Sequence, residues 1–203
     1  MRWAAALLAV VLLAGCVGTD LTPPLASAAE TVVADPAGLR RQHGIPDCPV
    51  DTASQSSGPS AAVMGGLPDL TLRCLGGDSP VRLASLRGPM LVNLWAVWCT
   101  PCRVEGPHLA SFAKAASGRV TLVGVDTADP DPALAAEFAQ SVGWTYMQVQ
   151  DPGHRLPDAL GLKGLPLTLF VDASGRVVYR QVGAFESEQQ IRDLVATHLG
   201  VRL

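Results

Sequence analysis

A pair of cysteines at a strand-to-helix junction is the feature that most constrains the fold of this chain. The run Trp-Cys-Thr-Pro-Cys at residues 98–102 directly follows residues 90–97, a continuous apolar segment typical of a strand buried on both faces. A helix is expected from about Thr100, with Pro101 in its first turn, where the N–H that proline lacks has no helical partner. Both sulfurs are therefore expected at the N-terminal end of a helix that packs on a sheet.

Two cysteines with this spacing and placement can carry out dithiol–disulfide exchange. The sulfur of Cys99 is expected over the unpaired N–H groups of the helix, whose partial positive charge favours a thiolate. A thiolate attacks a foreign disulfide, and Cys102 can then resolve the mixed disulfide. Zinc binding would need a second close pair of ligands, and haem attachment would need histidine where Arg103 stands. A purely structural bridge is the third alternative, although Pro between the sulfurs is uncommon there.

Strand and helix patterns alternate along the rest of the chain. Two short segments around a Gly-Gly-Asp turn, residues 67–74 and 81–86, form a predicted hairpin. Further strands are predicted at residues 120–125, 144–150, 165–171 and 177–182, and helices at residues 132–142, 154–160 and 186–199. In the first of these later helices, Leu134 and Phe138 are expected to face the core. This order predicts an α/β sheet covered by helices on both faces.

The first 15 residues are typical of a secretory signal. Arg2 precedes an apolar stretch, residues 3–13, that is shorter than the roughly 20 residues a membrane-spanning helix needs. The stretch ends in Leu-Ala-Gly before Cys16, which resembles the bacterial lipoprotein signal, in which the chain is cut before a cysteine that carries a lipid. An ordinary signal peptide or a short uncleaved anchor are the alternatives. All three predict a domain outside the cytoplasmic membrane.

Composition divides the remainder into a tether and one domain. Residues 16–64 are rich in Ala, Pro, Ser and Thr without an apolar period, so they are predicted to carry the lipid and form a flexible tether. Residues 65–203 are long enough for one core. The net charge of −3, with scattered arginines, gives no support to nucleic-acid binding.

The cysteine count permits a second bridge. Of five cysteines, Cys16 is assigned to the lipid and the junction motif takes two more. Cys48 and Cys74 are left for each other, and an oxidising exterior permits a structural disulfide between them. A relay of electrons from this pair to the first has nothing in the local sequence to support it.

In their order along the chain, these motifs resemble the thioredoxin fold and, more narrowly, the membrane-anchored TlpA/ResA-type thioredoxin-like reductases of bacteria. The resemblance covers about residues 65–203 and rests on Asn93-Leu-Trp95 before the cysteines, Glu105 and Pro107 after them, an insertion around residues 126–144, and Gly164-Leu-Pro166-Leu-Thr168. It implies a central mixed sheet flanked by helices, with an N-terminal hairpin and a central insertion. The tether and the pair Cys48/Cys74 lie outside the general pattern and would suit an actinobacterial member.

The resemblance also implies roles for individual residues. Cys99 is the expected attacking thiolate and Cys102 the resolving thiol. Glu105, three residues after Cys102 and so on the same helix face, is implied as the acid–base group in place of the buried Asp that thioredoxins have where this chain has Asn93. The alternative is a solvated surface Glu.

Four residues are implied to bind the substrate. Pro166 matches the cis-proline that faces the disulfide in this fold, and Leu165 is expected to offer its backbone to an extended client strand. Trp98 is expected beside the sulfurs, with a place in the core as the alternative, and Pro101 completes the set.

Together these features imply an extracytoplasmic, lipid-anchored thiol:disulfide oxidoreductase. The expected direction is reduction of protein disulfides, with apocytochrome c among the clients and a membrane dithiol as electron donor. No cofactor beyond the Cys99–Cys102 disulfide and no metal are expected. The alternatives are an oxidase that forms disulfides in secreted proteins and a non-catalytic metal-binding module on the same fold.

Overall fold

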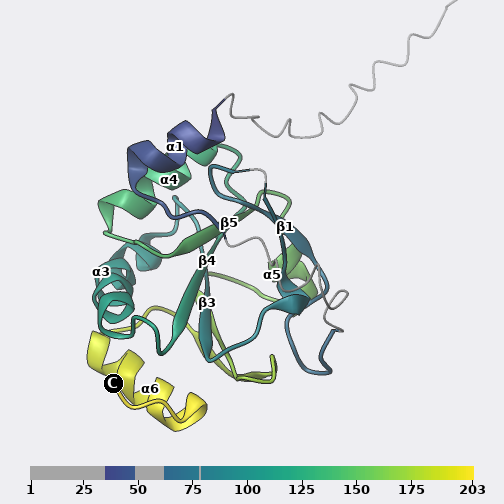
Figure 1. Ribbon diagram of the computed structural model, residues 1–203, viewed down its shortest axis with the longest axis vertical. Helices are drawn as coiled ribbons and strands as arrows, with labels where there is room; N and C mark the ends of the chain where they lie inside the picture. Colours follow the sequence, from purple (N-terminus) through teal and green to yellow (C-terminus); the bar gives the residue numbers. More distant parts are fainter. Residues whose placement is uncertain (1–34, 49–61, 78) are drawn as a thin grey trace, which may run out of the picture.

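The computed structural model describes residues 35–48, 62–77 and 79–203 (Figure 1). The predicted signal, Cys16 and most of the predicted tether lie outside these residues. No helix among the described residues has both the length and the apolar character needed to cross a bilayer.

A mixed seven-stranded sheet forms the centre of the molecule, in the order β2-β1-β5-β4-β3-β6-β7. Its strands are β1 (Thr71–Cys74), β2 (Pro80–Arg82), β3 (Met90–Trp95), β4 (Thr121–Thr127), β5 (Met147–Asp151), β6 (Leu167–Val171) and β7 (Val177–Val182). The neighbours β3, β4 and β5 are parallel, and every other pairing is antiparallel. The sequence-predicted thioredoxin-like α/β fold is confirmed, including the N-terminal hairpin of β1 and β2.

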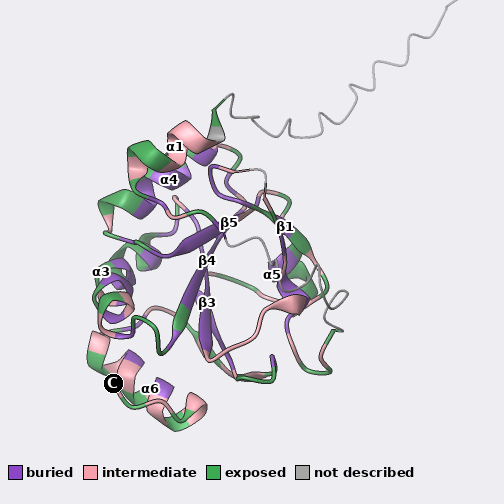
Figure 2. Ribbon diagram, viewed as in Figure 1, coloured by how far each residue is buried: buried purple, intermediate pink, exposed green. Residues whose placement is uncertain are grey.

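Helices cover both faces of this sheet. They are α1 (Pro36–His43), α3 (Thr100–Ala115), α4 (Pro132–Ser141), α5 (Arg155–Leu160) and α6 (Glu188–Leu199), with a 3-10 turn at Leu83–Ser85. One core cluster joins α3, α4 and α6 to the sheet, and a second joins α5 and the β1–β2 segment to it (Figure 1). Strand β3 contributes residues to both clusters, and all six of its residues are buried, as its apolar run predicts (Figure 2).

The predicted tether is wrong for residues 35–48. Asp35 caps helix α1 by accepting the Gly38 N–H at 2.7 Å, and Gly44 ends the helix in the left-handed conformation at φ 67°. Helix α1 packs against α4 (Figure 1), where His43 Nδ1 and Gln140 Oε1 are 2.8 Å apart. The average composition of the tether concealed this short helix, whose order comes from contacts with the domain.

The inward face predicted for α4 is half wrong. Phe138 is buried, but 52% of Leu134 is exposed. The positions that contact the core around Phe138 are alanines: Ala135, Ala136 and Ala139. Leu134 therefore lies outside the buried face of this helix, which Phe138 and these alanines form.

Candidate redox site

The Cys99–Cys102 disulfide lies at the N-terminal end of α3, directly after the turn that follows β3. Cys99 caps the helix, and its Sγ accepts the Cys102 N–H at 3.2 Å. Only 4% of Cys99 and none of Cys102 is exposed, so Cys99 is the more accessible residue of the pair. A thiolate on Cys99 would meet the partial positive charge of the helix end.

Glu105 is fully buried one helical turn beyond Cys102. Asn93 Nδ2 donates to its Oε1 at 2.8 Å, and the Phe185 N–H donates to its Oε2 at 3.1 Å. Burial raises the pKa of Glu105 to about 7, although the two hydrogen bonds act in the opposite direction. The carboxyl can therefore take up and release a proton near neutral pH, unlike the solvated surface Glu that was the alternative.

Asn93 belongs to a buried polar group that supports Glu105. Its Nδ2 also donates to Thr168 Oγ1 at 3.0 Å, so hydrogen bonds from Asn93 join β3 to both α3 and β6. Phe185, from the segment between β7 and α6, was missed at the sequence level because only its backbone takes part and it is 80 residues from Glu105.

The Leu165–Pro166 peptide bond is cis, as the resemblance implies, and it leads into β6. Strand β6 runs antiparallel to β3, with Leu167 opposite Leu94. Pro166, which precedes β6, therefore lies near the C-terminal end of β3. Leu165 is half-buried. A second cis peptide, Gly88–Pro89, was not predicted.

Trp98 lies on the surface, with 62% of the residue exposed, and so is not a core aromatic. It lines a pocket of about 220 Å³ together with Val97, Arg103, Asp129, Pro130, Asp131 and Leu134. Pro101 is also exposed, in the first turn of α3. Apolar surface is therefore available beside the disulfide.

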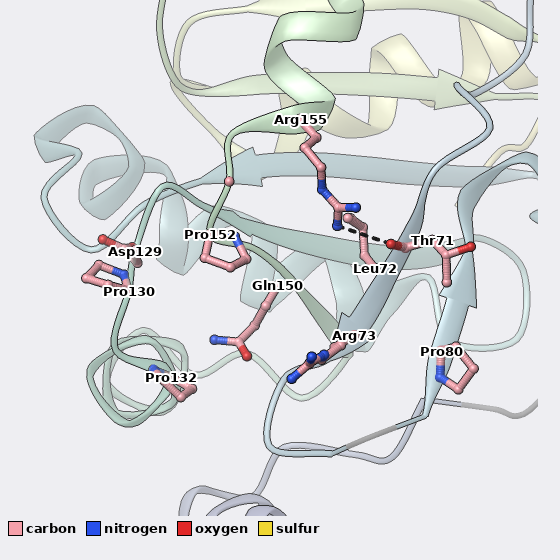
Figure 3. Close-up of a pocket in the computed structure, with 11 residues that line it drawn as sticks. Thr71, Leu72, Arg73, Pro80, Asp129, Pro130, Pro132, Gln150, Pro152 and Arg155 are labelled. Atoms are coloured by element: carbon pink, nitrogen blue, oxygen red, sulfur yellow. Dashed lines mark hydrogen bonds between the residues drawn. The ribbon is translucent and has the colours of Figure 1, made fainter. Parts of the chain in front are cut away.

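A larger cavity of about 510 Å³ adjoins this pocket and shares Asp129 and Pro130 with it (Figure 3). Arg155 points into it and donates to the Thr71 carbonyl at 3.1 Å (Figure 3). Prolines form much of its remaining wall: Pro80, Pro130, Pro132 and Pro152. None of the described residues that line it is a cysteine.

The structure joins Cys48 to Cys74 in a second, buried disulfide. Both residues belong to the core cluster that contains α5, whereas Cys99 and Cys102 belong to the cluster on the other face of the sheet. The folded domain therefore offers no direct exchange between the two bridges. Among the described residues, no group of three or more His, Cys, Asp or Glu side chains is placed to hold a metal ion.

Comparisons with known proteins match this arrangement. The Redoxin family model matches residues 63–196. The thiol:disulfide interchange protein HelX of Rhodobacter capsulatus is 35% identical over 128 residues, which are 62% of this chain and 70% of HelX.

Solved structures give the same result. A thioredoxin-family thiol:disulfide interchange protein from Chlorobium tepidum is 27% identical with a TM-score of 0.57, covering 70% of this chain and all of that one. A secreted disulfide oxidoreductase of Mycobacterium tuberculosis is 25% identical with a TM-score of 0.56, covering 64% of this chain and 96% of that one.

Proposed function

Because this chain belongs to the Redoxin family and is a thioredoxin-like thiol:disulfide oxidoreductase, we propose that it reduces protein disulfides outside the cytoplasmic membrane, to which a lipid on Cys16 anchors it. The observation that carries the proposal is the buried Glu105, one turn from Cys102, with a pKa of about 7. A group that titrates at neutral pH beside the resolving cysteine supplies the proton transfer that exchange requires.

The proposed cycle starts from the reduced dithiol. The Cys99 thiolate attacks one sulfur of a client disulfide, the client S–S bond breaks, and the client's other sulfur leaves as a thiolate. Glu105 accepts the proton of Cys102, whose thiolate then attacks Cys99. The mixed disulfide breaks, the second client thiolate leaves, and the Cys99–Cys102 bond forms. Two electrons pass to the client, and a membrane dithiol would return two to the enzyme.

Client binding is assigned to the surface around the disulfide. An extended client segment can pair with the backbone of Leu165 beside cis-Pro166, as a strand adds to a sheet edge. Trp98 provides exposed apolar area next to the attacking sulfur. HelX, named as a thiol:disulfide interchange protein, supports the reaction class, and apocytochrome c cysteines are the client we propose.

The direction of the reaction is tested by the reduction potential of the Cys99–Cys102 couple. For a reductase we expect a value near that of thioredoxin, about −270 mV, and catalysed reduction of insulin by the purified domain. A potential near −120 mV, typical of a strong oxidant, would assign the oxidase function instead. The variant Cys102→Ser should trap clients as mixed disulfides on Cys99, while Cys99→Ser serves as the matched control that traps none.

The role of Glu105 is tested by the pH dependence of the resolving step. In the wild-type protein, the rate at which Cys102 releases a mixed disulfide should show an inflection near pH 7, where Glu105 titrates. In Glu105→Gln this inflection should disappear, and the rate near pH 7 should fall about tenfold or more. Equal profiles for the two proteins would remove Glu105 from the mechanism.

A further inference from the structure

Both backbone groups of Val97, two residues before Cys99, are held by charged side chains. The Val97 N–H donates to Asp129 Oδ2 at 2.6 Å, and the Val97 carbonyl accepts from Arg103 Nη2, also at 2.6 Å. Hydrogen bonds to charged groups are stronger than those between neutral groups. The chain between β3 and α3 is therefore fixed from two sides at the residue that precedes Trp98.

The two holding side chains come from different elements. Asp129 is buried and belongs to the segment between β4 and α4, whereas Arg103 belongs to the first turn of α3. The Arg103 guanidinium carbon also lies 4.9 Å from the centre of the Phe138 ring on α4, within reach of a cation–π interaction. The insertion around residues 126–144 therefore contacts the active-site turn both directly and through Arg103.

We propose that Asp129 and Arg103 are positioning residues, which keep the backbone leading into Cys99 in place when the Cys99–Cys102 bond opens. The oxidised turn is joined to α3 by the disulfide, and reduction removes that link. The hydrogen bonds to Val97 do not depend on the disulfide, so they hold Cys99 at the helix end and within reach of Cys102 in the reduced protein. This inference rests on the proposed reductase cycle, in which both redox states must be competent.

A second buried carboxyl, that of Asp126 on β4, lies next to Asp129. Asp126 is fully buried, and its carboxyl interacts directly with that of Asp129. Burial, followed by the neighbouring Asp129 and then Asp151 on β5, raises the pKa of Asp126 well above its usual range. The matched comparison is therefore made at Asp129 itself, between two variants that both remove its charge.

The test compares Asp129→Ala with Asp129→Asn in the full domain. Both substitutions remove the charge, but the Asn amide oxygen can still accept the Val97 N–H. We expect Asp129→Ala to reduce insulin at least about tenfold more slowly than Asp129→Asn, since a small displacement of a reacting group costs that much or more. The pH midpoint for iodoacetamide alkylation of reduced Cys99 should also be about half a unit higher in Asp129→Ala than in Asp129→Asn, because the displaced sulfur interacts less with the positive end of the helix.

Equal rates and equal midpoints for Asp129→Ala and Asp129→Asn would overturn the inference. If Asp129→Ala does not fold, the exposed Arg103 gives a second comparison. Arg103→Ala should reduce insulin about threefold more slowly than Arg103→Lys. Equal rates of insulin reduction for Arg103→Ala and Arg103→Lys would also overturn the inference. A wild-type protein that fails to reduce insulin would refute the proposed function, while the alkylation comparison would still decide the positioning role.

Discussion

At the scale of single residues, Glu105 shows how opposing electrostatic effects set a useful proton affinity. Removing a carboxylate from water disfavours its charged form, and two hydrogen-bond donors, Asn93 and the Phe185 N–H, only partly offset this. The result is a pKa of about 7 in a group whose usual value is 4.5. The same burial that permits proton transfer therefore also affects the stability of the fold.

The stability of the oxidised protein should depend on pH through Glu105. The fold raises this pKa, so the protonated carboxyl contributes stability that is fully present below pH 4.5 and is lost as the pH rises to about 7. The loss should be about 1.4 kcal/mol per pH unit, or about 3 kcal/mol over the interval. Glu105→Gln cannot titrate, although its amide NH2 group must face one of the two donors that bind the carboxyl, Asn93 Nδ2 or the Phe185 N–H, which lowers stability at every pH.

Urea unfolding at a series of pH values checks this prediction. The free energy of unfolding of the wild type minus that of Glu105→Gln should fall steadily between pH 4.5 and 7. The constant offset from the lost hydrogen bond does not affect this slope. Two parallel pH curves would show that the folded-state pKa of Glu105 is not raised.

At the scale of elements, α3 is fitted closely to the end of α4 at Gly106. A Cβ on Gly106 would lie 2.9 Å from both Cβ and Cγ1 of Val142, closer than carbon atoms can approach without movement. The Gly106 carbonyl also accepts the Trp144 Nε1–H at 3.0 Å. Glycine thus lets α3, with Glu105 and both active-site cysteines, approach the insertion.

Gly106→Ala should therefore destabilise the protein, although alanine favours a helix by about 1 kcal/mol over glycine. We expect a net loss of about 1–2 kcal/mol in the free energy of unfolding, because overpacking exceeds the gain in helix propensity. Val142→Gly removes both contacting side-chain atoms, so it should cost less in the Gly106→Ala protein than in the wild type. Additive effects of the two substitutions would exclude the steric explanation.

The Cys48–Cys74 disulfide stabilises the attachment of helix α1, which the composition of its segment did not predict. Cys48 and Cys74 are 26 residues apart, and closing a loop of that length stabilises a fold by about 3.5 kcal/mol in the chain-entropy model. The double variant Cys48→Ala/Cys74→Ala should therefore unfold at a lower urea concentration than the wild type. The amide hydrogens of α1 should exchange faster than in the wild type, and those of β3 should change less. Insulin reduction should remain at the wild-type rate, because the other bridge lies across the sheet. A loss of activity without a loss of stability would instead support an electron relay.

Local patterns were sufficient to predict most elements, but contacts between distant residues were not predictable. The apolar run before Cys99 and the turn residues around β1 and β2 fixed those elements within a few positions. The hydrogen bonds of Glu105 with Phe185 and of Val97 with Asp129 join residues 80 and 32 apart, and no local periodicity contains them. Leu134 was misplaced because alanines, whose small side chains give a weak pattern, form the buried face of α4.

At the scale of the whole molecule, lipid attachment at Cys16 would determine where the enzyme works. In a bacterial host that processes lipoproteins, the wild-type chain should incorporate labelled fatty acid and sediment with membranes. Cys16→Ser should incorporate none, while Cys99→Ser should remain labelled as the matched loss of another cysteine. If the wild-type protein is not labelled, lipid attachment is excluded, and an ordinary secretory signal or an uncleaved anchor remains as the interpretation of the first 15 residues.

The covalent attachment of Cys48 to β1 has a practical consequence for anyone who shortens this protein. A recombinant fragment cut to the family match, residues 63–196, would lack Cys48 and leave Cys74 as an unpaired thiol. Oxidative refolding of such a fragment could pair Cys74 with Cys99 or with a second molecule. Either product would give a reduction potential and an activity that do not belong to the native protein. Fragments that begin before Asp35 and continue beyond Leu199 retain α1, both bridges and the whole of α6.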